Sequence, residues 1–361
     1  MKFNTPNETI FSIDLKKLES NFNYLKNTLL PETKIIAVVK AFAYGHGDVK
    51  IAKRLEKLGV YAFWVTDFEE GIILRKAGLK SKIIVANPGI KSYKKIITYK
   101  LDVVVYSHRL LDLYSKNNYP INIHLKFNTG MNRYGFENYN LKKLIQQILN
   151  NPHINLLSIC SHLASAEKPT KDKFTLTQIK RFESLSAEFE KILKKPILKH
   201  ILNSYGVINY NKYQMDAVRL GIGLYGGIKN NYLTSISKLE SVVTQSRVIN
   251  KGETVGYGCS FIARKKMKIS IVPVGYADGL NRKLSNGVGK VIINGLTCPI
   301  VGKISMGTFV VDTTNKSVKE GDIVEIFGEN LCVSNIAKSI NTIPYEIYAT
   351  LNRRLKRIYL N

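Results

Sequence analysis

Lys40 stands directly after an apolar run, residues 35–39, and a glycine-rich turn follows it in the stretch AVVKAFAYGHG. An ammonium group at the mouth of a buried strand is costly unless it is paired, deprotonated or able to reach water. One interpretation is a lysine at a strand end that extends its side chain into solvent. The other is a lysine kept neutral for covalent chemistry with an aldehyde. The residues around Lys40 leave both interpretations open.

Polar side chains also follow four later apolar segments, each at the point where a strand is expected to end. They are Lys126 and Arg133 in KFNTGMNRYGF, His162 in CSHLASAE, Asn203 and Ser204 in NSYG, and Arg219 in VRLGIGLYG. A single polar strand end needs no functional explanation, but a series of them is difficult to explain by folding alone. We therefore expect these side chains to share one site.

The elements that must position this site alternate between strands and helices over the first 230 residues or so. We expect strands at 34–40, 61–66, 82–87, 101–107, 121–127, 154–160, 199–203 and 216–220. Helical patterns, such as those at 67–78 and 174–195, separate most of them. Continuous apolar strands between helices indicate a parallel sheet covered on both faces, and eight such units predict an α/β fold, the (β/α)8 TIM barrel. An open doubly wound sheet is the alternative, although no GxGxxG follows the first strand.

The catalytic groups of such a barrel lie at the carboxyl ends of its strands, and a phosphate usually binds after strands seven and eight. Ser204 offers a hydroxyl there, and the backbone N–H groups near Gly221 and Ile222 offer uncharged donors. A phosphate site opposite an amine that reacts with an aldehyde fits pyridoxal 5′-phosphate.

From about residue 233 the pattern changes to strands and turns, in segments such as 268–275, 287–295, 297–306 and 321–328, with a short helix near 333–340. We therefore expect a barrel domain over residues 1–232 and a mostly β domain over residues 233–361.

The composition, with 45% hydrophobic and 22% charged residues among 361, is ordinary for a globular protein. No apolar run is long enough to span a membrane and no signal-peptide core is visible, so we expect a cytoplasmic protein. The net charge of +27 is spread along the chain, which favours a solvated basic surface over nucleic-acid binding; the alternative is a polyanion-binding protein. The four cysteines form no CxxC pair, so we expect neither a metal site nor disulfides.

The motifs of this chain resemble those of the alanine racemase family. AVVKAFAYGHG, KFNTGMNRYGF, SHLASAE, RLGIGLYG, VGYGCSF and VPVGYADGLNR occur in the family's order and together cover nearly the whole sequence. The resemblance implies a pyridoxal-phosphate enzyme with a barrel and a β domain. It also implies a head-to-tail homodimer that racemises L- and D-alanine and so supplies D-alanine for peptidoglycan. A serine or broad-specificity amino-acid racemase of the same fold is the alternative.

The resemblance also assigns roles to residues. Lys40 would form the Schiff base and then act as one of two proton-transfer groups, with Tyr257 of the partner subunit as the other. Tyr44, Asn203, Ser204, Gly221 and Ile222 would hold the phosphate. Arg219 would face the pyridine nitrogen, His162 would link Arg219 to Tyr257, and Arg133 would contact the phenolic oxygen. Met306 and Tyr276 would lie at the substrate end and the entrance, and Lys126 would be carbamylated.

Two departures from the family pattern could change the chemistry of the site. Gly307 stands where the family usually has an aspartate after the methionine, which removes a carboxylate and volume near the substrate and could widen the site. Arg353 stands about where many members have a tyrosine near the cofactor phosphate, and its guanidinium could pair with that phosphate.

Overall fold

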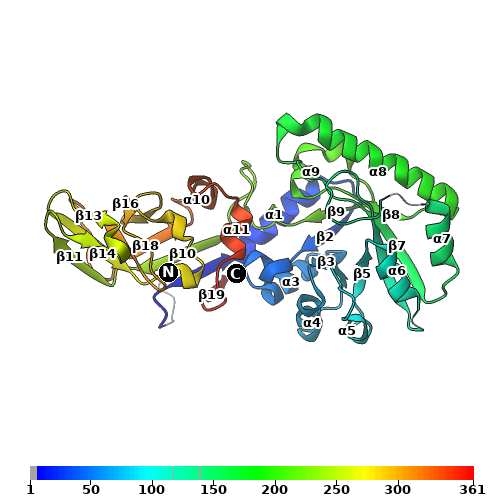
Figure 1. Ribbon diagram of the computed structural model, residues 1–361, viewed down its shortest axis with the longest axis horizontal. Coiled ribbons are helices and arrows are strands. Elements are labelled where there is room, and N and C mark those ends of the chain that lie inside the picture. The colour runs from blue at the N-terminus through cyan, green and yellow to red at the C-terminus, as the bar shows by residue number, and fades with distance from the viewer. Residues whose placement is uncertain (1–5, 117, 138–139) are drawn as a thin grey trace. The chain divides into compact units, whose positions relative to one another are not determined.

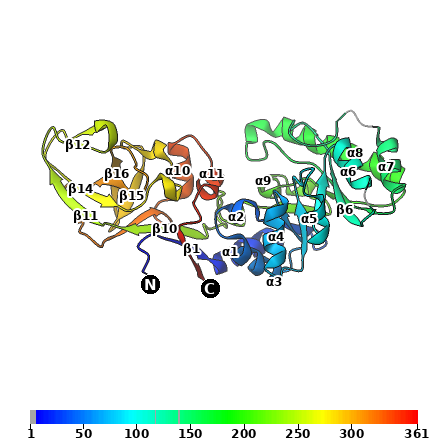
Figure 2. The ribbon, with the colours of Figure 1, turned by 60° about the horizontal axis from the view of Figure 1, so that its bottom comes forward.

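The computed structural model describes residues 6–116, 118–137 and 140–361. The chain forms two compact units. The first, here called the barrel unit, contains residues 22–43 and 48–224. The second, the β unit, contains residues up to Asn21, residues 44–47 and residues 225–361. Figures 1 and 2 show helices around a parallel sheet in the barrel unit and mainly strands in the β unit.

The barrel unit contains one eight-stranded sheet in the order β8-β7-β6-β5-β4-β3-β2-β9, and every neighbouring pair is parallel. Between the two end strands, the N–H of Arg219 donates to the carbonyl oxygen of Leu202 at 3.0 Å, so the sheet forms a nearly closed barrel. The strands are β2 (Lys34–Val38), β3 (Ala62–Val65), β4 (Lys82–Val85), β5 (Asp102–Val105), β6 (Ile121–Lys126), β7 (Ile154–Cys160), β8 (Leu198–His200) and β9 (Ala217–Leu220). The predicted TIM-barrel fold and its eight strands are confirmed.

Helices connect the strands and cover the outside of the sheet (Figure 1). They are α3 (Asp48–Lys57), α4 (Phe68–Lys76), α5 (Tyr93–Thr98), α6 (His108–Ser115), α7 (Leu141–Leu149), α8 (Asp172–Leu193) and α9 (Ser204–Asn209), with 3₁₀ turns η1 (Pro169–Lys171) and η2 (Asn211–Tyr213). The helices α1 (Leu15–Asn27) and α2 (Lys40–Tyr44) cross the division between the units. Strands such as β3 and β5 are buried throughout, because both faces of this parallel sheet are covered.

The β unit contains a nine-stranded sheet in the order β11-β14-β17-β16-β15-β18-β10-β1-β19. Its strands are β1 (Ile10–Asp14), β10 (Ser237–Val242), β11 (Gln245–Ile249), β14 (Met267–Val272), β15 (Lys290–Ile293), β16 (Leu296–Val301), β17 (Phe309–Asp312), β18 (Ile323–Phe327) and β19 (Lys356–Leu360). A small ladder joins β12 (Thr254–Val255) to β13 (Phe261–Ile262), and the helical elements are α10 (Val333–Ser339), α11 (Pro344–Ala349), η3 (Tyr257–Cys259), η4 (Tyr276–Asp278) and η5 (Arg282–Leu284). The predicted β domain and its short helix are confirmed.

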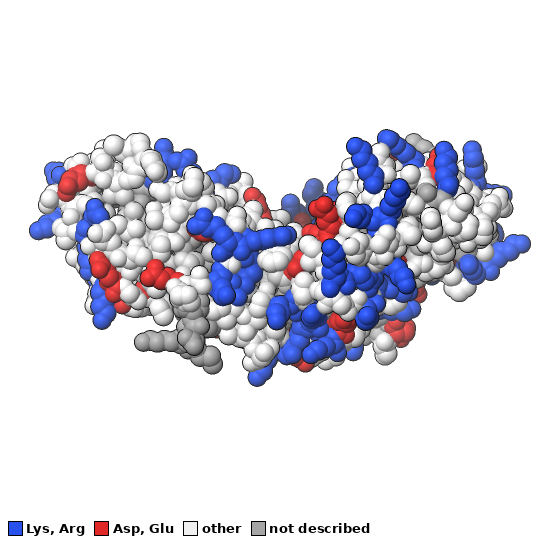
Figure 3. All heavy atoms as spheres, turned by 90° about the horizontal axis from the view of Figure 1, so that it is seen from below, with Lys and Arg blue, Asp and Glu red and all other residues white. Residues whose placement is uncertain are grey.

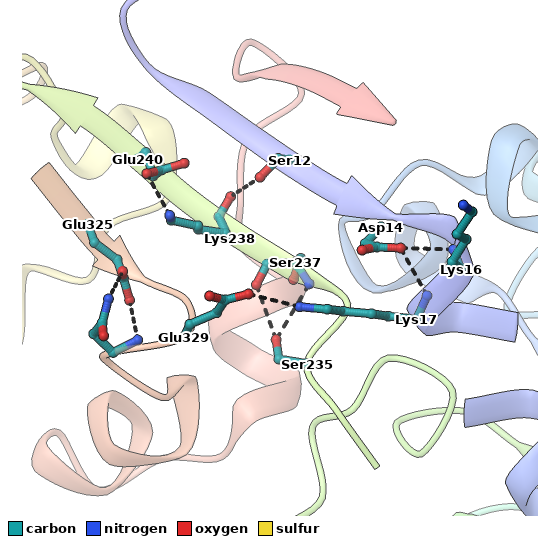
Figure 4. A network of polar contacts seen from close by, with 11 residues as sticks. Ser12, Asp14, Lys16, Lys17, Ser235, Ser237, Lys238, Glu240, Glu325 and Glu329 are labelled. Carbon is teal, nitrogen blue, oxygen red and sulfur yellow. Dashed lines mark hydrogen bonds and ion pairs between the residues drawn. The ribbon is translucent and has the colours of Figure 1, made fainter. Parts of the chain in front are cut away.

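The start of the chain belongs to this β sheet. The strand β1 pairs antiparallel with β10 and parallel with β19, so it joins two segments far along the sequence. Asp14 then starts helix α1, because its Oδ1 accepts from the N–H groups of Lys16 and Lys17, both at 2.9 Å. Figure 4 shows this cap beside the ion pair of Lys17 with Glu329, which has an N–O distance of 3.0 Å.

Charged side chains are scattered over the surface. In the face shown in Figure 3, lysine and arginine lie interspersed with aspartate and glutamate. Within the described ranges, no helix is both long and apolar enough to cross a membrane. In the same ranges no group of three or more metal-ligating side chains comes together, and all four cysteines have free thiols.

Candidate active site

Lys40 begins an unusual turn at the end of β2. The four residues 41–44 that follow it all have positive φ, between +51° and +58°. This left-handed conformation is unfavourable for L-residues other than glycine. Glu70 of helix α4 stabilises the turn, because its Oε1 accepts from the N–H of Ala41 at 2.6 Å and its Oε2 accepts from the N–H of Thr66 at 2.7 Å. The carboxylate therefore ties the segment after Lys40 to the end of the neighbouring strand β3.

The surroundings of Lys40 favour its neutral form. Burial lowers the pKa of Lys40, the charge of Arg133 lowers it further, and the charge of Glu70 opposes them. Burial also lowers the pKa of Lys126 to about 8, and the charges of Arg219, Arg133 and Lys40 contribute. A less basic amine is more often unprotonated and thus nucleophilic. Of the two interpretations of Lys40, this environment favours covalent chemistry.

Arg219 lies buried in β9 and donates to five acceptors, all of them uncharged groups. They are the ring Nδ1 and the carbonyl oxygen (3.2 Å) of His200, the ring Nδ1 of His162 (3.0 Å), and the carbonyl oxygens of Ser161 (2.6 Å) and Ile201 (3.1 Å). These contacts use both terminal nitrogens of the guanidinium. Its Nε has no acceptor among the described residues, so one N–H remains available to a ligand.

The two histidines beside Arg219 are held in their neutral form. Arginine has donors only, so each imidazole must accept at the nitrogen that faces it. Burial, followed by the charge of Arg219, lowers the pKa of His162 and of His200 well below the ordinary value. Trp64 covers this group, since its ring centroid lies 5.3 Å from the Arg219 guanidinium carbon and 5.9 Å from the His200 ring centroid. The buried arginine is thus fixed by neutral partners.

The turns after β8 and β9 meet at Ser204. The Ser204 Oγ accepts from the N–H groups of Gly221 at 2.9 Å and Gly223 at 3.3 Å. Asn203 begins helix α9, since its Oδ1 accepts from the N–H of Gly206 at 2.8 Å. The N–H groups of Ser204 and Ile222 have no acceptor among the described residues. These donors suit a phosphate and involve no charged side chain.

The structure brings together nine of the residues that the sequence marks, all of them in the barrel unit. They are Lys40, Lys126, Arg133, His162, Asn203, Ser204, Arg219, Gly221 and Ile222, at or just beyond the carboxyl ends of β2, β6, β7, β8 and β9. Four others belong to the β unit: Tyr44, which is buried, and Tyr257, Tyr276 and Met306, which are exposed by 69%, 44% and 61%. Arg353 is exposed in the β unit.

Sequence reasoning does not select three residues that contact the site, namely His200, Glu70 and Trp64. His200 lies in the expected strand at 199–203, and its place two residues from the strand's start marks it as inward-facing only once the register is known. Glu70 and Trp64 occupy a helix and a buried strand with no motif of their own. His200 is the last residue of β8, but the expected strand at 199–203 placed it inside a strand, where a polar residue gave no signal.

Comparison with known proteins identifies the family. The family models for the alanine racemase N-terminal and C-terminal domains match residues 13–229 and 236–359. The chain belongs to the alanine racemase family. It is 32% identical over 369 residues to alanine racemase 2 of Caldanaerobacter subterraneus subsp. tengcongensis, an alignment that covers 98% of this chain and 95% of that protein.

Solved structures of the family share the fold along the whole chain. Alanine racemase from Clostridium difficile 630 superposes with a TM-score of 0.91 at 30% identity, covering 99% of this chain and 97% of that one. Alanine racemase from Bartonella henselae with covalently bound pyridoxal phosphate superposes with a TM-score of 0.87 at 32% identity, covering 98% and 100%. These comparisons confirm the resemblance seen in the motifs and the expected enzyme class, an isomerase of this family.

Proposed function

We propose that this protein interconverts L- and D-alanine with pyridoxal 5′-phosphate bound at the carboxyl ends of the barrel strands. The observation that carries the proposal is a lysine of lowered pKa together with a buried arginine that keeps its Nε–H for a ligand. Lys40 supplies the amine that reacts with the cofactor aldehyde, Arg219 donates to the pyridine nitrogen, and the turns at Ser204 hold the phosphate. When bound, the cofactor withdraws electrons from the substrate Cα and makes its proton acidic.

Arg219 determines the type of reaction in this proposal. A guanidinium does not readily give up a proton. Its partners here are uncharged groups, which accept hydrogen bonds from Arg219 without removing the proton. Arg219 would therefore face the pyridine nitrogen of a bound cofactor as a donor that keeps its own proton. Such a contact would favour return of the proton to Cα over transamination.

Racemisation needs one base on each face of Cα. Lys40 serves one face, and Tyr257 of the partner subunit serves the other. Since the Nδ1 of His162 accepts from Arg219, the neutral ring carries its proton on Nε2. That N–H can donate to the Tyr257 oxygen, so His162 links Arg219 to the second base.

The homodimer is part of the proposal, and exposed residues of the β unit support it. Tyr257 and Met306 are 69% and 61% exposed on their own chain, although an aromatic and a long apolar side chain gain free energy when they are covered. A mixture of inactive Lys40→Ala and Tyr257→Phe subunits tests the shared site. If subunits exchange freely, half of the dimers are mixed and one of their two sites is intact, so about a quarter of wild-type activity returns. If no activity returns, each site is completed within one chain.

The other residues have supporting roles. Arg133 contacts the phenolic oxygen of the cofactor, Tyr44 contributes to phosphate binding, and Met306 and Tyr276 line the substrate end and the entrance. Lys126 is carbamylated: its nitrogen bonds to the carbon of CO₂ and loses a proton. Its pKa of about 8 supports this, because a neutral amine is what CO₂ requires, and the resulting anion would pair with Arg133. A crystal structure with a bare amine at Lys126 would exclude the carbamate.

The substrate is alanine, and supply of D-alanine to peptidoglycan in the cytoplasm is the biological role that we propose. A broader amino-acid racemase is the second candidate, and Gly307 is the observation that favours it. A methyl group built on Gly307 would meet no atom within 4 Å, so this position leaves open space where the family usually has an aspartate.

The first experiment is α-proton exchange in D₂O. Purified protein with added pyridoxal 5′-phosphate is incubated with single L-amino acids, and loss of the α-proton signal is followed by NMR. Rapid exchange with alanine alone supports the proposal, and equal exchange with serine or larger amino acids supports the broader racemase. If no amino acid exchanges, the proposed function is wrong, and the basic surface should be tested for binding of polyanions.

A further inference from the structure

A second group of polar side chains runs through the interior of the barrel. It consists of Asp102 of β5, His124 of β6, Ser158 of β7 and His200 of β8, on four neighbouring strands (Figures 1 and 2). Each of these residues is at most 5% exposed. Barrel interiors are normally filled by layers of apolar side chains, and buried polar groups are costly unless they are hydrogen-bonded. None of Asp102, His124 and Ser158 touches the proposed ligand-binding residues directly, so their presence requires an explanation.

These side chains form a continuous series of contacts that begins at Arg219. The ring Nδ1 of His200 accepts from Arg219, and the other ring nitrogen, Nε2, lies 3.3 Å from the Oγ of Ser158. The same Oγ lies 2.6 Å from the Nδ1 of His124. The Nε2 of His124 lies 3.7 Å from the Oδ2 of Asp102, and neither atom has another partner within the described part of the chain.

The donors in this series must all point the same way. Arg219 can only donate, so the Nδ1 of His200 accepts and the proton of the neutral ring sits on Nε2. That N–H donates to Ser158, whose hydroxyl proton is then directed to the Nδ1 of His124. His124 in turn carries its proton on Nε2, which faces the Asp102 carboxylate. The donor-only guanidinium thus fixes one end, and the acceptor-only carboxylate faces the other end at 3.7 Å, beyond direct hydrogen-bond distance.

We propose that Asp102, His124 and Ser158 are positioning residues, which hold His200 in the tautomer that accepts from Arg219 and thereby fix the guanidinium. The alternative tautomer of His200 would turn an N–H toward Arg219, so that two donors would face each other at a buried contact. The guanidinium would then have to move, and its Nε–H would move with it. This inference rests on the proposed role of Arg219 toward the cofactor.

Asp102→Asn is the most informative substitution, since it keeps the shape of the side chain and can reverse the series. The Asp102 Oδ1 accepts from the side-chain amide of Asn122 at 2.8 Å, so an asparagine would place its oxygen there and its NH₂ toward His124. The Nε2 of His124 would then accept, its proton would move to Nδ1, and Ser158 would donate to His200 instead. The comparable effect of a wrong histidine tautomer is known from Asp→Asn changes beside catalytic histidines.

The experiment reads the tautomers directly. The cofactor-loaded full-length protein is labelled with ¹⁵N-histidine, and long-range ¹H–¹⁵N correlation spectra are recorded; the chain has only six histidines, which substitution can assign. We expect the Nε2–H tautomer at both His124 and His200 in the wild type, and the Nδ1–H tautomer of His124 in Asp102→Asn. Asp216→Asn is the matched control, since Asp216 accepts from the N–H of Lys199 at 2.7 Å outside this series.

Racemisation provides the second readout. Asp102→Asn and Ser158→Ala should each lower kcat about tenfold with little change in KM, since one buried hydrogen bond is lost or reversed. Ser186→Ala, which removes a buried hydroxyl that donates to the Phe182 carbonyl oxygen, should leave kcat within about twofold. The proposal is overturned if the wild type carries Nδ1–H on His200 or a doubly protonated His124. It is also overturned if both Asp102→Asn and Ser158→Ala keep the wild-type tautomers. If the tautomers are as expected but the wild type exchanges no amino acid, the proposed function is wrong, whereas the positioning role of Asp102, His124 and Ser158 is retained.

Discussion

Glu70→Gln should destabilise the protein, because it weakens the hydrogen bonds that hold the backbone after Lys40. Four consecutive residues, 41–44, lie in the left-handed region, where each L-residue costs about 1–2 kcal/mol. The Glu70 carboxylate accepts from the N–H groups of Ala41 and Thr66 at 2.6 and 2.7 Å. A glutamine has one acceptor oxygen, so its NH₂ would face one of these two donors.

The magnitude follows from the two hydrogen bonds. Bonds to a charged group contribute about 1.5–3 kcal/mol each, and glutamine retains one ordinary bond of about 1 kcal/mol, so the net loss is about 2–5 kcal/mol. The carboxylate charge also raises the pKa of Lys40, so its removal should lower that pKa further. Urea unfolding at pH 7.5 measures the stability, and NMR titration of ¹³C-labelled lysine measures the pKa.

Glu69→Gln is the control, because Glu69 is an exposed neighbour on the same helix α4. We expect it to change the unfolding free energy by less than about 0.5 kcal/mol. If Glu70→Gln also changes that free energy by less than about 0.5 kcal/mol, the carboxylate does not hold the turn, and the left-handed segment is stabilised by its packing.

Four further results are expected. In CO₂-free buffer, the lowered pKa of Lys126 should make stability rise by about 3 kcal/mol from pH 8 to pH 10.5, because the unfolded chain keeps the proton that the folded chain has lost; in urea unfolding, Lys126→Met should remove this part of the rise and leave the part due to Lys40. Gly307→Asp should lower exchange of serine relative to alanine in D₂O, and an unchanged ratio would count against a widened site. Arg219→Glu should protonate the pyridine nitrogen, so racemisation should fall at least about a hundredfold while release of pyruvate, followed by coupled lactate dehydrogenase, should increase. Lys40→Ala should abolish alanine exchange without altering retention on heparin, which would separate the active site from the basic surface; loss of both would link them.

The sequence predicts the fold well where strands are almost entirely buried. The β3, β4 and β5 segments are short, mainly apolar runs between helices. Their positions agree with expectation, because strands of a parallel sheet that is covered on both faces are recognised by such runs alone. The strand β1 was not expected. Its five residues, IFSID, precede the first helix and pair with segments more than 200 residues away, and no local pattern carries such information.

The candidate site is predictable to the extent that its residues end strands. Lys40 and Ser204 lie just beyond their strands and Arg219 lies near the end of β9, and the barrel brings these strand ends together. Glu70 and Ser158 could not be selected in this way. Glu70 acts through backbone N–H groups on another segment, and Ser158 depends on which strand residues face inward, which only the register decides.

The place of β1 in the sheet also orders events during synthesis. The strand β1 is translated before the other strands of its sheet, but its partner β19 lies at Lys356–Leu360. The barrel strands, which end at Leu220, can assemble while the β unit still lacks strands, since domains generally fold as units from the N-terminal end. Until β19 has been translated, β1 has an unpaired edge exposed to other chains. Deletion of β19 (Lys356–Leu360) should therefore lower the yield of soluble protein and increase aggregation through the exposed edge of β1, before it affects the barrel.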